Sequence, residues 1–204
     1  MPAQNLRVPF SLDLKPPKNR DKPRHPGAIS AQHKKEDSIL KFEHLRHKPP
    51  TELEEERPLI VACSPLRSNV NLSTIFRTAG CCGVREIIAT GNAKLIGKIA
   101  RDGAEHVNLT TKNSLPPVLK KLKQEGYALV GLEQTTNSTR LADYAFPKKT
   151  ALVVGSEREG LSGDCLALLD AVVEIPVWGM PYSYNVATAT SMALYEYCRQ
   201  YPAG

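Results

Sequence analysis

Hydrophobic positions follow two alternating patterns from residue 57 to the end of the chain. Five short runs rich in β-branched residues predict buried strands, because a strand covered on both faces reads as a nearly continuous apolar run. These runs are 59–63, 85–90, 127–133, 150–155 and 171–177. Between them lie segments with apolar residues every three or four positions, which is the spacing of one helix face. The alternation predicts an α/β domain with a mostly parallel sheet covered by helices on both faces.

Three of the helical segments are well marked. The first follows the strand 59–63 and has Leu72, Ile75, Phe76 and Ala79 on one face. The second, 114–126, begins with a serine, carries prolines in its first turn and ends in glycine, as helix termini commonly do. The third follows a Gly- and Pro-rich loop and runs over 186–199 with a long apolar stripe. Its expected first residue lies at either of two good capping residues, Ser183 or Asn185.

The first quarter of the chain has a different composition. Residues 1–50 hold 11 Lys and Arg against 5 Asp and Glu, whereas the other 154 residues hold 16 of each, so the net charge of +6 lies at the amino-terminal end. Half of the 16 prolines also fall there. We therefore expect 1–56 to be a basic extension, extended over 1–30 with a short helix near 36–47, and 57–204 to be the folded domain. The extension is either a solubilising linker or an arm that binds RNA.

Several classes of protein are excluded or disfavoured by what the sequence lacks. It has no run of eighteen apolar residues and no apolar stretch typical of a secretory signal, so we expect a cytoplasmic protein with no membrane partner. Its five cysteines form no CxxC pair, so we expect reduced thiols and no metal. It contains no GxG, GKS, GKT or GxSxG pattern, which disfavours a Rossmann loop, a P-loop and an esterase elbow.

Polar residues lie just after the first strand. Asn71 sits where the chain turns from strand to helix, so its amide can cap the helix or face a ligand. Arg77, six residues later, is either a surface arginine or a group that binds an anion.

A glycine-bounded turn follows the strand 150–155. Gly155 and Gly160 allow the backbone to bend tightly and to approach a ligand closely. Between them, Glu157 can accept hydrogen bonds from backbone amides or pair with a basic group, although the segment also fits an ordinary turn.

The loop that precedes the last helix carries a third polar group. Ser183 and Asn185 can cap that helix, or they can form a polar pocket for a cofactor together with the free N–H groups of its first turn.

In this order and spacing, the three segments resemble the SpoU/TrmH family of RNA 2′-O-ribose methyltransferases, a branch of the SPOUT superfamily. The resemblance covers about 57–200 and rests on three patterns. They read Asn71…Arg77-Thr-Ala79…Gly83, then Gly155-Ser-Glu157-Arg-Glu-Gly160-Leu161, then Ile175-Pro176…Gly179…Ser183-Tyr184-Asn185-Val186. The stretch 131–148 is more similar to the tRNA D-loop guanosine enzymes than to the rRNA branch.

The resemblance implies a fold and a cofactor. In this family the carboxy-terminal segment forms a deep trefoil knot, an exception to the rule against threaded chains, and S-adenosylmethionine binds within the knot. Backbone groups of Gly155, Ile175 and Tyr184 would contact its adenosine part. Tyr184 departs from the usual Leu or Phe, which a main-chain contact tolerates. The family is homodimeric, and the helix 186–199 would lie at the subunit interface.

The resemblance also implies catalytic roles. Arg77 would orient the ribose 2′-hydroxyl and a neighbouring phosphate, and we favour this role over that of a base because arginine stays protonated. Asn71, Ser183 and Asn185 would complete the polar shell, and Glu157 would order it. No metal is required, since the positively charged sulfur of the cofactor is itself the leaving group.

Other functions stay open at this point. The favoured substrate is a guanosine of the tRNA D-loop, and a ribose of 23S rRNA is the alternative. Two other interpretations remain. The protein is a knotted methyltransferase that acts on a base nitrogen, or it is a homologue that binds RNA without catalysis.

Overall fold

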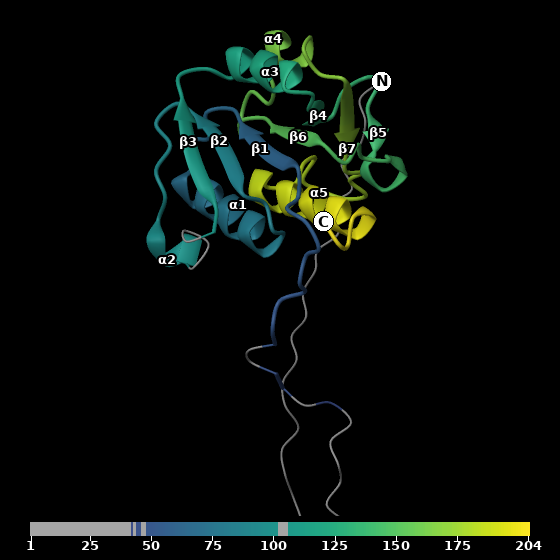
Figure 1. Cartoon of the computed structure of the whole chain (residues 1–204). Helices are drawn as coiled ribbons and strands as arrows, with labels where there is room; N and C mark the ends of the chain where they lie inside the picture. The colour runs from purple at the N-terminus through teal and green to yellow at the C-terminus, as the bar shows by residue number, and fades with distance from the viewer. Residues whose placement is uncertain (1–41, 43, 46–47, 102–105) are drawn as a thin grey trace, which may run out of the picture. The chain divides into compact units, whose positions relative to one another are not determined.

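A parallel sheet of seven strands forms the centre of the part of the chain that the structure describes (Figure 1). The structure is a computed structural model that describes residues 42, 44–45, 48–101 and 106–204, and residues 49–204 form one compact unit. The strand order is β3-β2-β1-β6-β4-β7-β5, and every neighbouring pair is parallel. The strands are β1 Leu59–Cys63, β2 Glu86–Thr90, β3 Asn108–Lys112, β4 Ala128–Leu132, β5 Thr139–Arg140, β6 Thr150–Val154 and β7 Ala171–Glu174.

Helices cover both faces of the sheet. They are α1 Asn69–Cys81, α2 Gly97–Ala100, α3 Leu115–Gln124, α4 Gly163–Leu166 and α5 Val186–Gln200, with a short 3-10 turn, η2, at Leu141–Asp143. Helices α1 and α5 pack side by side on one face, and α3 and α4 lie on the other (Figure 1). Each face has its own apolar core: Phe76 and Tyr197 lie in the first, and Leu119 and Cys165 lie in the second.

The five strands and three helices expected from the sequence are present, and the expected sheet with helices on both faces is confirmed. The strand expected over 171–177 ends earlier, at Glu174, two residues before Pro176, which has no N–H to give to a sheet. Strand β3 was not expected, because its sequence NLTTK is polar and lies half-exposed at the sheet edge. The short elements β5, α2 and α4 carry no periodic signal. The predicted extension, with its basic arm and the helix near 36–47, lies mostly outside the described residues.

Helix α1 begins one turn earlier than expected. Its N-cap is Ser68, whose hydroxyl accepts a hydrogen bond from the backbone N–H of Asn71 at 3.4 Å, so of the two roles left open for Asn71 the capping of this helix is excluded. The helix ends at Cys81 with Cys82 as its C-cap, and the next residue, Gly83, has a positive φ of 68° that glycine adopts without strain. The backbone N–H of Val84 donates to Ala79 at 2.9 Å, completing the turn that closes the helix.

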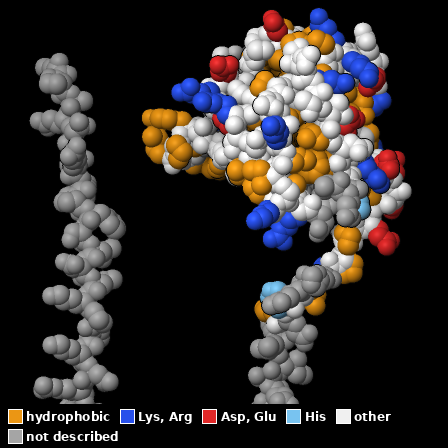
Figure 2. Space-filling model, turned by 90° about the vertical axis from the view of Figure 1, so that its left-hand side faces the viewer, with side chains coloured by type: hydrophobic (Ala, Val, Ile, Leu, Met, Phe, Trp, Pro, Cys, Tyr) orange, Lys and Arg blue, Asp and Glu red, His pale blue; other side chains and the backbone are white. Residues whose placement is uncertain are grey.

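Several large hydrophobic side chains stay exposed on the compact unit. Trp178, Met180 and Tyr182 are exposed in the loop between β7 and α5, and Val70, Met192 and Tyr195 are exposed on α1 and α5. Figure 2 shows hydrophobic side chains gathered on a projection of one side, with Lys and Arg side chains close by. Among the described residues, no helix has the length and apolar character needed to cross a membrane.

Candidate active site

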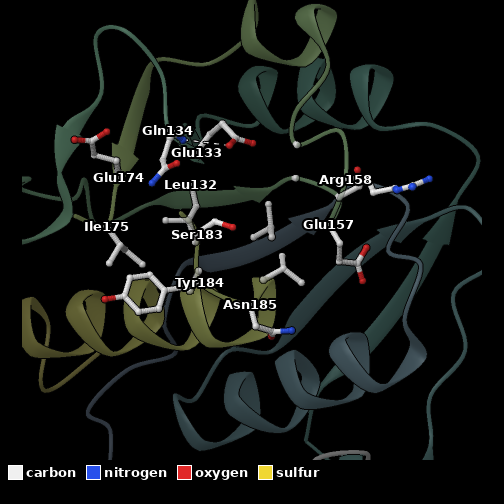
Figure 3. A pocket seen from close by; sticks show the side chains of 16 residues that line it. Leu132, Glu133, Gln134, Glu157, Arg158, Glu174, Ile175, Ser183, Tyr184 and Asn185 are labelled. Atoms are coloured by element: carbon white, nitrogen blue, oxygen red, sulfur yellow. Dashed lines mark hydrogen bonds between the residues drawn. The ribbon is translucent and has the colours of Figure 1, made fainter. Parts of the chain in front are cut away.

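A cavity of about 440 Å³ opens at the carboxyl ends of three neighbouring strands, β6, β4 and β7 (Figure 3). This edge is where parallel α/β sheets commonly bind ligands, and the volume is within the usual range for small molecules. The walls come from the ends of β4, β6 and β7, from the turn after β6 and from the start of α5. The lining residues are Leu132, Glu133, Gln134, Val154, Gly155, Ser156, Glu157, Arg158, Gly160, Glu174, Ile175, Ser183, Tyr184, Asn185, Val186 and Ala189.

A chain of hydrogen bonds joins the cavity to the beginning of α1. The Asn185 side-chain amide donates to the Asn71 side-chain oxygen at 3.1 Å, and the Asn71 amide donates to Glu157 Oε1 at 2.9 Å. Asn185 Oδ1 meanwhile caps α5 by accepting from the backbone N–H groups of Ala187 and Thr188. Asn185, and not Ser183, is therefore the cap of α5. Side chains from three separate segments are thus fixed relative to one another.

Glu157 is held by the amino-terminal end of α1. Its carboxylate accepts hydrogen bonds from the backbone N–H of Arg67 at 2.8 Å and of Ser68 at 3.1 Å, besides that from Asn71. Burial acts to raise the pKa of Glu157, but these hydrogen bonds outweigh it and hold the pKa below its usual value. The carboxylate is therefore ionised at neutral pH. Its stabilising contribution is present above the usual pKa of 4.5 and is lost as the pH falls through the lower folded-state value.

The turn after β6 folds back tightly on itself. Ser156 and Gly160 form an antiparallel bridge, with backbone hydrogen bonds of 3.0 and 3.2 Å. A β-carbon on Gly155 would lie 2.5 Å from the carbonyl carbon of Gly160. The absence of a side chain at Gly155 therefore lets the backbone of Gly160 pack closely against it. Glu133 holds the far side of the turn, because its carboxylate accepts from the backbone N–H of Leu161 at 3.0 Å. The position of Glu157 depends on this packing.

The structure brings most of the candidate residues together. Six of the eight line the cavity: Gly155, Glu157, Ile175, Ser183, Tyr184 and Asn185. Asn71 contacts two of them through its amide. Arg77 does not reach the cavity: it lies exposed on α1, and among the described residues none forms a hydrogen bond or ion pair with its guanidinium. The absence of a metal stays a prediction.

Sequence reasoning missed five polar residues of the cavity, among them Ser156 in the turn after β6. Glu133 and Gln134 directly follow β4, and Glu174 is the last residue of β7. Arg158 also lines the cavity, although its guanidinium points away from it in Figure 3. A signal for Glu133, Gln134 and Glu174 existed, because the residues after two neighbouring parallel strands meet at one edge of the sheet.

The two roles of Asn185 can be separated by substitution. We expect Asn185→Ala to lower the free energy of unfolding by about 1 kcal/mol, because α5 loses its cap. Asn185→Asp keeps a capping oxygen and adds a negative charge that the helix end favours, so we expect stability within about 0.5 kcal/mol of the parent chain. Urea unfolding of both variants measures the difference, and an equal loss in both would contradict this account of the cap.

Comparison with known proteins identifies the family. The model of the SpoU rRNA Methylase family matches residues 58–195, and the chain belongs to that family. The tRNA (guanosine(18)-2′-O)-methyltransferase of Aquifex aeolicus is 30% identical over 149 residues, covering 71% of each protein. The mouse tRNA (guanosine(18)-2′-O)-methyltransferase TARBP1 is 33% identical over 152 residues, which are 70% of this chain, and the chain spans only 9% of that protein's length.

The fold is also that of solved family structures. The SpoU methyltransferase AviRb from Streptomyces viridochromogenes, in complex with its cofactor AdoMet, has a TM-score of 0.63 and is 27% identical. The match covers 74% of this chain and 63% of AviRb. The α/β sheet that the sequence predicts is thus the one these enzymes share.

Proposed function

We propose that this protein transfers a methyl group from S-adenosylmethionine to a ribose 2′-hydroxyl of tRNA, with a D-loop guanosine as the favoured target. The observation that carries the proposal is the hydrogen-bonded series Glu157–Asn71–Asn185 beside the cavity, in a chain of the SpoU family. The relatives from Aquifex aeolicus and mouse, both named as tRNA guanosine-18 2′-O-methyltransferases, support the substrate class. Ribosomal RNA is the second candidate, supported by the family description.

The cavity fits both the adenine ring and the positively charged groups of the proposed cofactor. Apolar side chains, among them Leu132, Val154 and Ile175, suit an adenine ring, and the backbone at Gly155, Ile175 and Tyr184 would supply its polar contacts. Carboxylates of Glu157 and Glu174 suit the positive charges of the sulfonium and amino groups. When bound, the cofactor supplies an electrophilic methyl group with a good leaving group.

The chain's own residues would position the hydroxyl and stabilise the negative charge that develops on its oxygen. Fixing the 2′-hydroxyl in line with the methyl carbon accounts for much of the rate gained in such a reaction. The Ser183 hydroxyl and the Asn185 amide line the cavity and can hydrogen-bond the ribose, while Glu157 holds Asn71 in place. Arg77 would bind the phosphate next to the target and stabilise negative charge on the attacking oxygen.

The placement of Arg77 supports a homodimer in which this arginine serves the partner's cavity. Arg77 lies on the exposed side of α1, two turns from Val70, and Met192 and Tyr195 are exposed on the adjacent α5. A second copy covering these apolar side chains would bury them and bring the arginine near a cavity.

The family resemblance also supports a trefoil knot formed by the segment after β7. In keeping with such a knot, the turn after β6 and the start of α5 line the same cavity.

Mixing two inactive variants tests the shared site. Arg77→Ala and Asn185→Asp chains, unfolded together and refolded, would form mixed dimers in which one of the two sites is intact. Since half of randomly paired dimers are mixed, we expect activity to return to about a quarter of the parent level. No gain over the separate variants, at equal dimer content by light scattering, would assign Arg77 to its own chain's cavity.

The basic extension is proposed to supply the field that attracts RNA. Residues 51–204 carry no net charge, so the excess of +6 in residues 1–50 is the main source of phosphate neutralisation. We expect deletion of 1–50 to weaken tRNA binding at least tenfold at low salt and to flatten its salt dependence, with cofactor binding unchanged. Fluorescence anisotropy with labelled tRNA measures both, and an unchanged affinity would refute the role of the arm.

The substrate class is tested by offering both RNA pools. Purified protein is incubated with methyl-labelled S-adenosylmethionine and with tRNA or rRNA from cells that lack the gene. We expect label in tRNA alone. Label in rRNA alone would replace the proposed substrate, and cofactor binding without transfer to either pool would favour the interpretation of an RNA-binding homologue.

A further inference from the structure

Two cysteine side chains meet at the end of α1 that is remote from the cavity. Cys82 caps this helix and Cys198 lies near the end of α5, and neither lines the cavity. The Cys198 thiol donates a hydrogen bond to the Cys82 carbonyl oxygen at 3.7 Å, which places the Cys198 sulfur directly against Cys82. Both residues are half-buried, unlike the fully buried Cys63 and Cys165. Asn71 lies at the opposite end of the 13-residue helix, about 15–20 Å away.

A buried cation lies beside this pair. Arg57 is only 7% exposed; its guanidinium donates to the Tyr201 carbonyl oxygen, but its buried Nε has no hydrogen-bond partner among the described residues. A buried charged donor left without a partner is costly, so the position favours an anion next to it. The positive charge of Arg57 favours the thiolate form of both Cys82 and Cys198.

The two thiols therefore differ in acidity. A hydrogen bond from Cys82 lowers the pKa of Cys198 to about 7, with help from Arg57 and against the effect of burial. The same hydrogen bond, together with burial, raises the pKa of Cys82. The lowered pKa gives Cys198 more thiolate character near neutral pH than an ordinary cysteine has, and the thiolate is the reactive form of cysteine.

We propose that Cys198 and Cys82 form an oxidisable dithiol site that reacts with hydroperoxides and closes to a reversible disulfide between α5 and α1. The Cys198 thiolate attacks one peroxide oxygen, the O–O bond breaks, and a sulfenic acid and an alkoxide or hydroxide are formed. The Cys82 sulfur then attacks the sulfenic sulfur, the S–S bond forms and the S–O bond breaks. The protons of the pair leave with the oxygens, so two thiols and one hydroperoxide give one disulfide, one alcohol and one water.

Such a cross-link would join the two helices that carry Asn71 and Asn185. It would form without any change in the cavity lining, because both cysteines lie outside it. Neighbouring Cys81 provides a matched control, since it is more exposed than Cys82 but belongs to no such pair. The site is independent of the methyl transfer proposed above.

Peptide mapping after mild oxidation tests the proposal. The full-length reduced protein is treated with a small excess of hydrogen peroxide, quenched, digested without reductant and analysed by mass spectrometry. We expect a peptide linked through Cys82 and Cys198, a loss of two hydrogen atoms per chain, and reversal by dithiothreitol. The same link should form in Cys81→Ser.

The single variants distinguish the two roles. We expect Cys82→Ser to stop at a sulfenic acid on Cys198, which a dimedone probe labels, and Cys198→Ser to show neither product. Arg57→Met should slow the reaction at pH 7 about threefold or more, because less of Cys198 is then thiolate. A cross-link through Cys81, or equal oxidation of Cys198→Ser and the parent chain, would overturn the proposal.

Discussion

Replacing Arg77 with alanine is expected to lower kcat/KM for methyl transfer to RNA by about 10²–10³, the range seen when one preorganised electrostatic group is removed from an active site. The reason is that Arg77 would bind the phosphate beside the target ribose and stabilise charge on the attacking oxygen. Its side chain is exposed and makes no hydrogen bond or ion pair within the described residues. We therefore expect the free energy of unfolding and the affinity for S-adenosylmethionine to stay unchanged.

Three measurements on one preparation check this separation: urea unfolding, calorimetric cofactor binding and methyl transfer. Arg85→Ala is the matched control, because Arg85 is also an exposed arginine but pairs with Glu56 at 3.0 Å, outside the cavity lining. We expect the control to keep parent activity. An Arg77→Ala protein that is as active as this control would remove Arg77 from the mechanism. Loss of cofactor binding in Arg77→Ala would show that Arg77 acts on the cofactor and not on the RNA phosphate.

Replacing Gly155 with alanine is expected to abolish cofactor binding and to destabilise the domain by about 1–3 kcal/mol, the usual cost of forcing extra atoms into a packed interior. The new methyl group would lie 2.5 Å from the Gly160 carbonyl carbon and 2.8 Å from the Leu161 nitrogen. These atoms belong to backbone and cannot rotate away. The turn must therefore move, and it carries Glu157 and one wall of the cavity with it.

Gly163→Ala provides the control for this effect. Gly163 is the first residue of α4, a few residues beyond the same turn, and a β-carbon there would meet no atom within 4 Å. We expect parent-like stability and cofactor affinity from it. If Gly155→Ala bound S-adenosylmethionine as tightly as Gly163→Ala does, the tight packing at Gly155 would not be what forms the cavity wall.

Much of the site could be predicted from the sequence because its residues follow strands or begin helices. Gly155 comes directly after β6, and Asn185 directly before α5, so local pattern alone places both at the ends of elements. Parallel strands then bring their carboxyl ends to one edge. Family resemblance added which of the candidate residues form one group, and the structure brings six of the eight into one cavity.

The parts that escaped prediction depend on contacts between distant segments. The hydrogen bonds of Asn71 to Glu157 and Asn185 join positions 86 and 114 residues apart, which no local pattern encodes. The same holds for Glu133, which supports the turn after β6 from a different strand. Strand β3 was missed for another reason: an edge strand needs little apolar character, so its polar sequence does not alternate.

The chemical identity of the product tests the central claim most directly. Unmodified tRNA treated with the protein and S-adenosylmethionine is digested to nucleosides and analysed by mass spectrometry, with the Arg77→Ala protein run in parallel. We predict a 2′-O-methylguanosine in which the added mass lies on the ribose, and a backbone that resists alkaline cleavage at that nucleotide. A methyl group on the base instead would contradict the proposed chemistry, whatever the RNA.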